Sequence, residues 1–433
     1  MATAAVLTVP TAVRANGRLA ATVDVHVPRV GVARVAVPAT FGLLLSSDQG
    51  ASFHWVCEDA LGYGGTYDPD YDIGNDGSLY ATTFDGLRRS TDGGCEWPLV
   101  GPFSPDLLVN DVDIAADGAV WAAAASSQQN GVYRSGDGVN YSRTNIDRDR
   151  AVWLSIGIAE SDPDRVYLGG FQFPDLNPPG GGMGATQALL YRSLDGGDNW
   201  EELSTTTFEL GTTPRPFIAG ILPAQPEVIF VRSEQAINAA GDIIYRSSDG
   251  GVSFAEVLRM DGRIRAFLVR RDGTTIIAGT AGAGVMISTD AGLTWSPAAS
   301  EPQMACIDET DTGELLSCGA NGEPDFYALA RSTDAAIWDK VFRFADIAGP
   351  LECDAGTVQA DTCATEKWPE LAGQLGIDGF VDSGPGGALA DAGQTRDPKG
   401  CAGCNASGSF AAMLVLPVFG FRRRKSGRGR AES

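Results

Sequence analysis

The chain has 433 residues, of which 43% are hydrophobic and 20% charged, enough to bury one large domain or two to three ordinary ones. Its 55 acidic residues outnumber 32 basic ones, and the net charge of −23 argues against binding to nucleic acid or to an anionic lipid surface. Glycine, at 55 residues, is abundant enough to favour a chain rich in turns and strands over a helical one.

The N-terminal segment, residues 1–19, is mildly apolar but has no charged start, so it resembles no signal peptide. We also find no recognisable strand pair in the first forty residues. We therefore expect Met1 not to be the biological start of an exported chain.

A short polar loop then recurs seven times, as in YRSLDGGDNW (191–200) and YRSSDGGVSF (245–254). We call these segments the Ser-Asp loops, and they begin 41 to 58 residues apart. The copies at Ser135 and Ser332 are one residue short, and Ala336 stands near the expected glycine of the last one. The loop residues are Ser46, Asp48, Gly50, Ser90, Asp92, Gly94, Trp97, Ser135, Asp137, Ser193, Asp195, Gly197, Trp200, Ser247, Asp249, Gly251, Phe254, Ser288, Asp290, Gly292, Trp295, Ser332, Asp334 and Trp338.

Each repeat predicts four short strands: an opening apolar run such as 152–159, a second run such as 165–170, a third that enters the loop, and a fourth that starts at the aromatic residue. A period of this length indicates a propeller blade. The loop chemistry is structural, because the Asp carboxylate can accept backbone N–H groups, Gly permits a positive φ, and the Ser hydroxyl ties to the turn. The sequence therefore predicts an all-β, seven-bladed propeller with four-stranded blades over residues 20–345, with the Ser-Asp loops on equivalent outer hairpins.

Two longer insertions, at 171–187 and 233–242, fall between the second and third strands of their blades. Extra loop length can point to function, but a tolerated surface insertion is the simpler interpretation.

The pattern S-x-D-x-G-x-[ST]-[WFY] resembles the Asp-box of the BNR-repeat propellers, over roughly residues 40–345. That family includes sialidases, xyloglucan-degrading glycosidases, sortilin-type receptors and photosystem II assembly factors. The resemblance implies that the boxes lie on the outer rim, away from any chemistry.

After the propeller we expect a segment with a Cys pair at 346–378, a flexible linker at 379–400 and a C-terminal tail at 401–433. The tail holds Cys401 and Cys404, a short apolar stretch and an Arg cluster, and it resembles the MYXO-CTERM sorting signal of myxobacteria. This implies export, processing at one of the two cysteines and membrane contact only through the tail. A redox CxxC would need a thioredoxin-like unit, and a zinc site would need ligands other than the distant His26 and His54.

The other six cysteines are candidates for disulfides in an oxidising compartment. We expect Cys306 and Cys318 to pair across a hairpin, Cys57 and Cys95 to pair between neighbouring blades, and Cys353 and Cys363 to close a short loop.

No catalytic, cofactor-binding or metal-binding residue is predicted. The segment DPDYDIGNDG (68–77) spaces Asp68, Asp70 and Asp72 like a calcium loop, but its Gly comes one position late and the closing Glu is missing, so an acidic turn is favoured.

The arginines needed to clamp a sialic acid mostly lie beside the loops, leaving Arg215, Arg263 and Arg265 as inner candidates. Those beside the loops are Arg88, Arg89, Arg134, Arg192, Arg246 and Arg331. We therefore expect a non-enzymatic, exported or cell-surface propeller that binds a protein or glycan partner. The alternative is a glycoside hydrolase that acts on polysaccharide, but not a sialidase.

Overall fold

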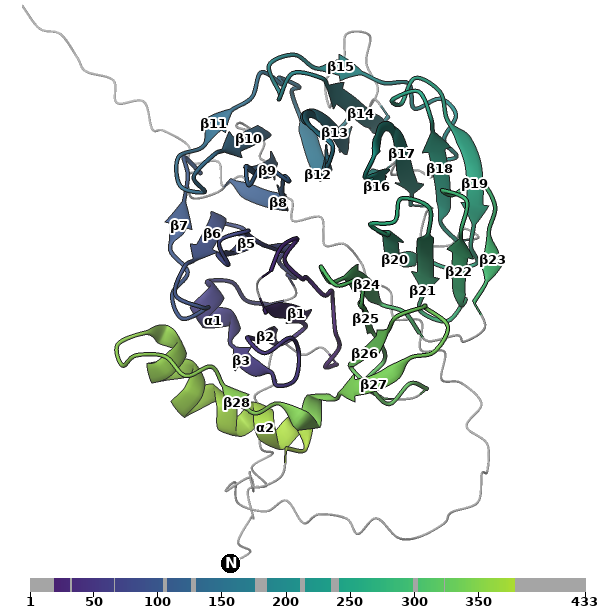
Figure 1. The fold of residues 1–433 in the computed structure, drawn as a ribbon. Coiled ribbons are helices and arrows are strands. Elements are labelled where there is room, and N and C mark those ends of the chain that lie inside the picture. Colours follow the sequence, from purple (N-terminus) through teal and green to yellow (C-terminus); the bar gives the residue numbers. More distant parts are fainter. Residues whose placement is uncertain are drawn as a thin grey trace, which may run out of the picture. The chain divides into compact units, whose positions relative to one another are not determined.

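The computed structural model describes residues 19–31, 33–65, 67–103, 107–125, 130–175, 185–210, 215–234, 241–298, 303–322 and 324–377. In this part of the chain, seven four-stranded sheets follow one another around a ring (Figure 1). The predicted seven-bladed β-propeller is therefore confirmed. The sorting tail, with Cys401 and Cys404, and the linker before it lie outside the described residues.

Blades 2 to 7 are built in chain order from the inner to the outer strand. Blade 2 contains β4 (Tyr71–Ile73), β5 (Leu79–Thr83), β6 (Gly86–Ser90) and β7 (Leu99–Val100), and blade 3 contains β8 (Leu108–Ile114), β9 (Val120–Ala125), β10 (Gly131–Ser135) and β11 (Ser142–Arg143). Blade 4 contains β12 (Ala151–Ala159), β13 (Asp162–Gln172), β14 (Gln187–Ser193) and β15 (Glu201–Glu202), and blade 5 contains β16 (Pro216–Leu222), β17 (Gln225–Ser233), β18 (Ile243–Ser247) and β19 (Ala255–Arg259). Blade 6 contains β20 (Ile264–Val269), β21 (Ile276–Thr280), β22 (Val285–Ser288) and β23 (Ser296–Pro297), and blade 7 contains β24 (Cys306–Glu309), β25 (Leu315–Cys318), β26 (Leu329–Ser332) and β27 (Asp339–Phe342). Both predicted insertions do fall between the second and third strands, of blades 4 and 5.

Blade 1 differs from the others. It contains β1 (Val35–Ala39), β2 (Gly42–Ser46) and β3 (His54–Val56), and it gains β28 (Gly349–Pro350) as an outer, parallel strand. Its inner position is filled by residues 22–26, which pair with β1 through the isolated bridges Thr22–Ala39 and His26–Ala36. Within the described part of the first forty residues, β1 is a strand, but its partner β2 lies beyond residue 40 and the only pairings inside that stretch are the two isolated bridges.

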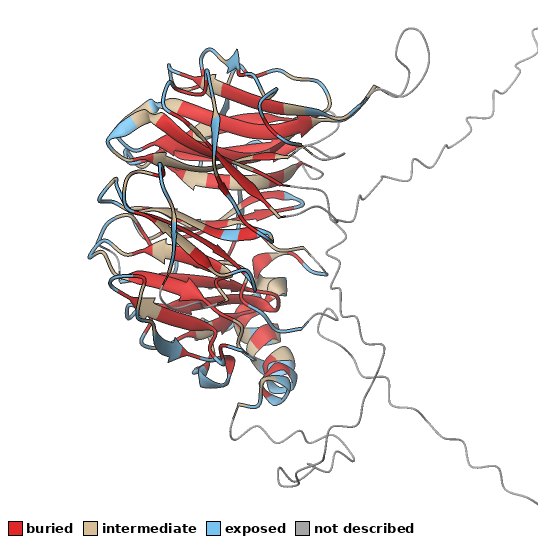
Figure 2. Ribbon diagram, turned by 90° about the vertical axis from the view of Figure 1, so that its right-hand side faces the viewer, coloured by how far each residue is buried: buried red, intermediate tan, exposed pale blue. Residues whose placement is uncertain are grey.

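The hydrophobic core lies between the blades rather than at one centre. Each of the seven seams between neighbouring sheets has its own cluster of buried side chains among the described residues. In the seam of blades 3 and 4, for example, Trp121 and Trp153 are both fully buried. Figure 2 shows the same pattern, with buried strands and exposed residues mainly at the edges of the ring. Burial of apolar side chains against the neighbouring blade is what holds each sheet in place.

The Ser-Asp loops connect the third and fourth strands of the blades, and their polar groups satisfy one another. In the loop of blade 5, the Ser247 hydroxyl donates to Asp249 Oδ1 at 2.7 Å, and the Gly251 N–H donates back to Ser247 Oγ at 2.8 Å. Asp249 Oδ1 also accepts the Ser253 N–H at 2.9 Å. These bonds close the turn within seven residues, which explains why the loop can be repeated without a ligand.

The two short loops keep the same plan with one residue fewer. Ser135 Oγ accepts the N–H of Gly138, and Ser332 Oγ accepts that of Ala335, each three residues on and at 2.9 Å. Ala335 takes φ +60°, a conformation that normally favours glycine.

Arginines beside the loops connect neighbouring blades at the rim. Arg89 Nη1 donates to the Asp137 carbonyl at 3.1 Å, Arg192 Nη1 to the Gly250 carbonyl at 2.8 Å, and Arg246 Nε to the Ala291 carbonyl at 3.0 Å. Arg331 likewise donates to the Gln49 carbonyl and so joins blade 7 to blade 1. These guanidinium groups therefore hold neighbouring blades together.

The last segment that the structure describes, residues 344–377, returns from blade 7 to blades 1 and 2, and we call it the strap. The strap contains a 3-10 helix (Phe344–Asp346), β28, a π-helix (Gln359–Lys367) and α2 (Trp368–Leu375); a short helix, α1 (Glu58–Leu61), follows β3. Figure 1 shows the strap running along the outside of β3. It packs into the same hydrophobic cluster as blades 1 and 7, through Phe344, Trp368 and Leu371.

The π-helix and the first residue of α2 place three side chains against blade 1. Gln359 exchanges hydrogen bonds with the backbone at Trp55 and Cys57, Cys363 forms a disulfide, and Trp368 packs against Trp55 with 5.7 Å between ring centroids. A π-helix has about 4.4 residues per turn, so Cys363 and Trp368, four and nine residues after Gln359, lie on the same side of the helix as Gln359. In an α-helix, Trp368 would lie on the opposite face.

Two of the three predicted disulfide pairings are wrong. Cys306–Cys318 is present on paired positions of β24 and β25, as expected from the hairpin. Cys57, however, pairs with Cys363, and Cys95 pairs with Cys353. The reason is the strap, which brings the C-terminal cysteines to the outer edges of blades 1 and 2.

Candidate functional site

Inner strands of four blades bring a group of ionisable side chains to the axis of the ring. We call this group the axial cluster, and it consists of Asp24, His26, Arg29, Asp70, Asp72, Asp111, Asp113 and Asp308. Its members come from the segment before β1, from the start and middle of β4, from β8 and from β24. Side chains alternate along a strand, so the pairs Asp70/Asp72 and Asp111/Asp113 each point to one side.

Five of the six carboxylates bind the backbone of the next blade. Asp70 and Asp72 each accept an N–H of β8, from Val112 and Ile114, both at 2.9 Å. Asp111 and Asp113 bind the corresponding N–H groups of β12, from Ile156 at 2.5 Å and from Ile158 at 3.3 Å.

Asp308 of β24 makes a similar contact from blade 7 to blade 1 by accepting the Val27 N–H at 2.9 Å. The sixth carboxylate, Asp24, accepts only the N–H of its own neighbour Val25.

The enclosure of these carboxylates raises their pKa values, because burial disfavours the charged form. The pKa of Asp111 rises to about 7, and those of Asp24 and Asp308 to about 6. For Asp70 the loss of water is reinforced by the charge of Asp111, to which it is also hydrogen-bonded, and its pKa lies well above the usual range. Asp70 and Asp111 thus behave as a pair that shares a proton.

Two basic groups accompany the acids. Arg29 Nη2 lies 3.5 Å from Asp113 Oδ1, and its positive charge also faces Asp72 and Asp308. His26 stands between Asp70 and Asp308, but burial outweighs their charges and lowers its pKa. Within the described residues, no group of three or more His, Cys, Asp or Glu side chains has the arrangement of a metal site.

The segment 68–77 is not the acidic turn that its sequence suggests. Tyr71–Ile73 forms β4, and Asp70 and Asp72 serve the axis, while the turn itself is made by residues 74–77. A sequence signal for the axial cluster exists, since DYDI (70–73) and DVDI (111–114) open consecutive repeats with the same spacing. Its meaning depends on knowing that these strands are innermost.

Two of the three inner arginine candidates are already paired with an acid. Arg215 and Arg263 both pair with Glu234, and Arg215 Nη1 lies 3.9 Å from its carboxylate. Arg232, two residues before Glu234, lies 3.9 Å from Asp242 and stacks over Phe217. These contacts neutralise charge that a carboxylate substrate would need.

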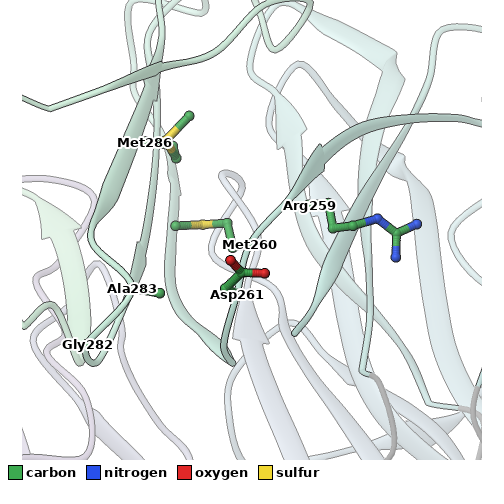
Figure 3. Close-up of a pocket in the computed structure, with 6 residues that line it drawn as sticks. All are labelled: Arg259, Met260, Asp261, Gly282, Ala283 and Met286. Atoms are coloured by element: carbon green, nitrogen blue, oxygen red, sulfur yellow. The ribbon is translucent and has the colours of Figure 1, made fainter. Parts of the chain in front are cut away.

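A second feature is a pocket of about 460 Å³ in the seam between blades 5 and 6. It is lined by Arg259, Met260 and Asp261, which end β19, and by Gly282, Ala283 and Met286, which surround the start of β22. In Figure 3 Met260 and Asp261 face the β22 side of the pocket, whereas Arg259 extends away from the two methionines. The volume is in the range of sites for small ligands or for one side chain of a partner.

Known proteins resemble this chain only in fold. No protein-family model matches the sequence, and no curated protein matches it. A hydrazine synthase structure from Kuenenia stuttgartiensis is similar with a TM-score of 0.52 and 10% identity, over 76% of this chain and all of the other.

Two further structures are more distant. The GH74 xyloglucanase of Xanthomonas campestris has a TM-score of 0.48 and 15% identity over 73% of this chain, which spans only 60% of the xyloglucanase chain. YCF48 from Cyanidioschyzon merolae has a TM-score of 0.45 and 15% identity, over 70% of this chain and 94% of the other. At these identities the likeness concerns the propeller architecture alone.

Proposed function

We propose that this protein is an exported, non-enzymatic β-propeller of the Asp-box type that binds a protein or glycan partner. The observation that carries the proposal is the use of its charged groups. Five of the six axial carboxylates accept backbone N–H groups of a neighbouring blade, and four rim arginines donate to neighbouring carbonyls. Groups committed in this way stabilise the ring rather than transform a substrate.

Export is supported by the three disulfides, since such bonds persist in oxidising compartments. Within the described residues, no helix has the length and apolar character needed to span a bilayer. We propose surface display through the C-terminal tail, as its MYXO-CTERM-like pattern implies.

We place the partner at the seam pocket of blades 5 and 6. Methionine side chains adapt to different apolar shapes, and Asp261 beside them can orient a polar neighbour. The proposed contact is therefore one apolar group of the partner, a side chain or a sugar face, with polar contacts around it.

The experiment compares three purified proteins on a glycan array and on a panel of glycosidase substrates. We expect Met286→Glu to weaken binding at least about tenfold, while Ile337→Glu, at a rim side chain that is 72% exposed, leaves it unchanged. Equal binding by all three proteins would show that the binding site does not include this pocket. Turnover of any glycoside by the unaltered protein would refute the non-enzymatic assignment.

A glycoside hydrolase that acts on polysaccharide is the second candidate, because Asp111 keeps a proton up to about pH 7, as a general acid must. Against it, Asp70 and Asp111 are in direct hydrogen-bond contact, whereas glycosidase carboxyls stand about 5 to 9.5 Å apart. Hydrolysis of a neutral glycan that Asp111→Asn abolishes would establish this alternative. We expect no turnover of a sialoside in either case.

A further inference from the structure

The outer edge of blade 1 is covered by the chain's own β28. The Ala348 N–H donates to the Phe53 carbonyl at 2.9 Å, and the Leu351 N–H donates to the Trp55 carbonyl at 2.8 Å. Between these two bonds, Gly349 and Pro350 pair in parallel with His54 and Trp55. Without this segment, the Phe53 carbonyl would lose its partner and β3 would be an open sheet edge, while the Trp55 carbonyl would keep its bond from Gln359.

Two disulfides hold the strap, and they differ in exposure. Cys57 and Cys363 are buried, with 1% and 0% of their surface exposed, and so are Cys306 and Cys318 of the hairpin. Cys95 and Cys353 are both half-exposed, since they join a Ser-Asp loop of blade 2 to the segment directly after β28. A thiolate must reach a sulfur to attack a disulfide, so Cys95–Cys353 is the bond open to exchange.

The helical part of the strap has its own attachment to blade 1. Besides Cys57–Cys363, the Gln359 side chain donates to the Trp55 carbonyl at 2.8 Å, and Lys367 Nζ lies 2.6 Å from Asp59. Trp368 is 3% exposed and packs on Trp55. None of these contacts needs Cys353, so the helices can stay in place when the outer disulfide opens.

We propose that Cys95–Cys353 is a reversible redox latch over the outer edge of blade 1. A dithiol reductant supplies two electrons and two protons, becomes a disulfide itself, and leaves Cys95 and Cys353 as free thiols. Residues 348–357 then detach from β3 while Cys57–Cys363 keeps the strap tethered. Because Cys353 is only ten residues from the tethered Cys363, its local concentration near Cys95 stays high, and an oxidant recloses the same bond.

The first test maps thiols during a titration of the full chain with dithiothreitol. We expect Cys95 and Cys353 to be alkylated at reductant concentrations at least about tenfold lower than the four cysteines of the two buried disulfides require. Simultaneous release of Cys57 and Cys363, or their earlier release, would overturn the proposal.

The second test follows amide hydrogen exchange in a Cys95→Ser/Cys353→Ser variant, with Cys306→Ser/Cys318→Ser as the matched control. The amides of Ala348 and Leu351 should exchange at least about tenfold faster in the first variant and at the original rate in the second. In the unaltered protein, the same amides should lose protection on mild reduction and regain it on reoxidation. Unchanged protection of β28 without the outer disulfide would show that the latch does not exist.

Discussion

The pKa values of aspartate side chains are shifted in opposite directions at the rim and at the axis of this ring. In the Ser-Asp loops, Asp249 is exposed and receives hydrogen bonds from Ser253 and Ser247, which lower its pKa to about 2. At the axis, Asp111 is enclosed, and burial raises its pKa to about 7. The difference teaches that hydrogen bonds to a solvated carboxylate favour its charge, whereas removal of water opposes it even when N–H donors are present.

The two environments also differ in what they join. A rim carboxylate closes a turn within its own blade, so its effect is local. Four of the axial carboxylates, those of β8 and of the segment at β4, each join two blades through residues 42 to 45 positions apart in the chain. Loss of an axial acid should therefore cost more than loss of a rim acid.

Removal of the Asp111 side chain should produce the largest effect. Asp111→Ala leaves the Ile156 N–H without its acceptor and deprives Asp70 of its partner, so we expect the free energy of unfolding to fall by about 2 to 3 kcal/mol. Asp111→Asn keeps an acceptor and should lose less than about 1 kcal/mol. Denaturant unfolding of both variants measures this, and equal losses would show that the backbone bond is not the important contact.

The pH dependence of stability should separate the two environments. Folding raises the pKa values of Asp24, Asp111 and Asp308 to about 6 to 7 from about 3.8, so their contribution is full below about pH 4 and is lost as the pH rises through 6 to 7. Folding lowers the rim pKa values to about 2, so their contribution is present above about pH 4 and is lost as the pH falls through 2.

We therefore expect the melting temperature to peak near pH 4 and to fall by some degrees on either side. Asp111→Asn should flatten the alkaline side only, and Asp249→Asn the acidic side only. A single optimum that neither variant changes would contradict the assignment of the two groups.

Loss of a rim hydroxyl should have a smaller effect. Ser247→Ala removes the acceptor of the Gly251 N–H and the donor to Asp249, which should cost about 1 kcal/mol. Ser248→Ala, at the exposed neighbouring position of the same loop, is the matched control and should change nothing. A large loss in the control would mean that the whole loop, not the buried bond, was disturbed.

The smallest effect is expected for the rim arginines. Arg246→Lys loses the fixed donor to the Ala291 carbonyl and part of the stacking on Phe230, and the expected cost is about 0.5 kcal/mol. Calorimetry of this variant and of Arg259→Lys measures the difference. Arg259 is the comparison because its guanidinium pairs with the exposed acids Glu209 and Glu256.

The rim was predictable from the sequence and the axis was not, for a physical reason. Each Ser-Asp loop completes its hydrogen bonds within seven residues, so spacing alone reveals it, and the period of the loops gives the blades. The partners of Asp70 lie on another blade, and nothing local distinguishes an innermost strand from an acidic turn. The predicted pairing of Cys57 and Cys95 was wrong for the same reason. The strap brings each of them a partner that is far away in the chain, at a separation of 306 residues for Cys57 and 258 residues for Cys95.

The most direct test of the account is a titration of the aspartate carboxyl groups of the intact protein by carbon NMR. We predict two separate populations: rim carboxyls such as Asp249 that are still charged at pH 3, and an axial population that includes Asp111, assigned through Asp111→Asn, that loses its protons only near pH 6 to 7. A single population that titrates near pH 4, with no signal removed from the upper range by Asp111→Asn, would contradict the division between rim and axis.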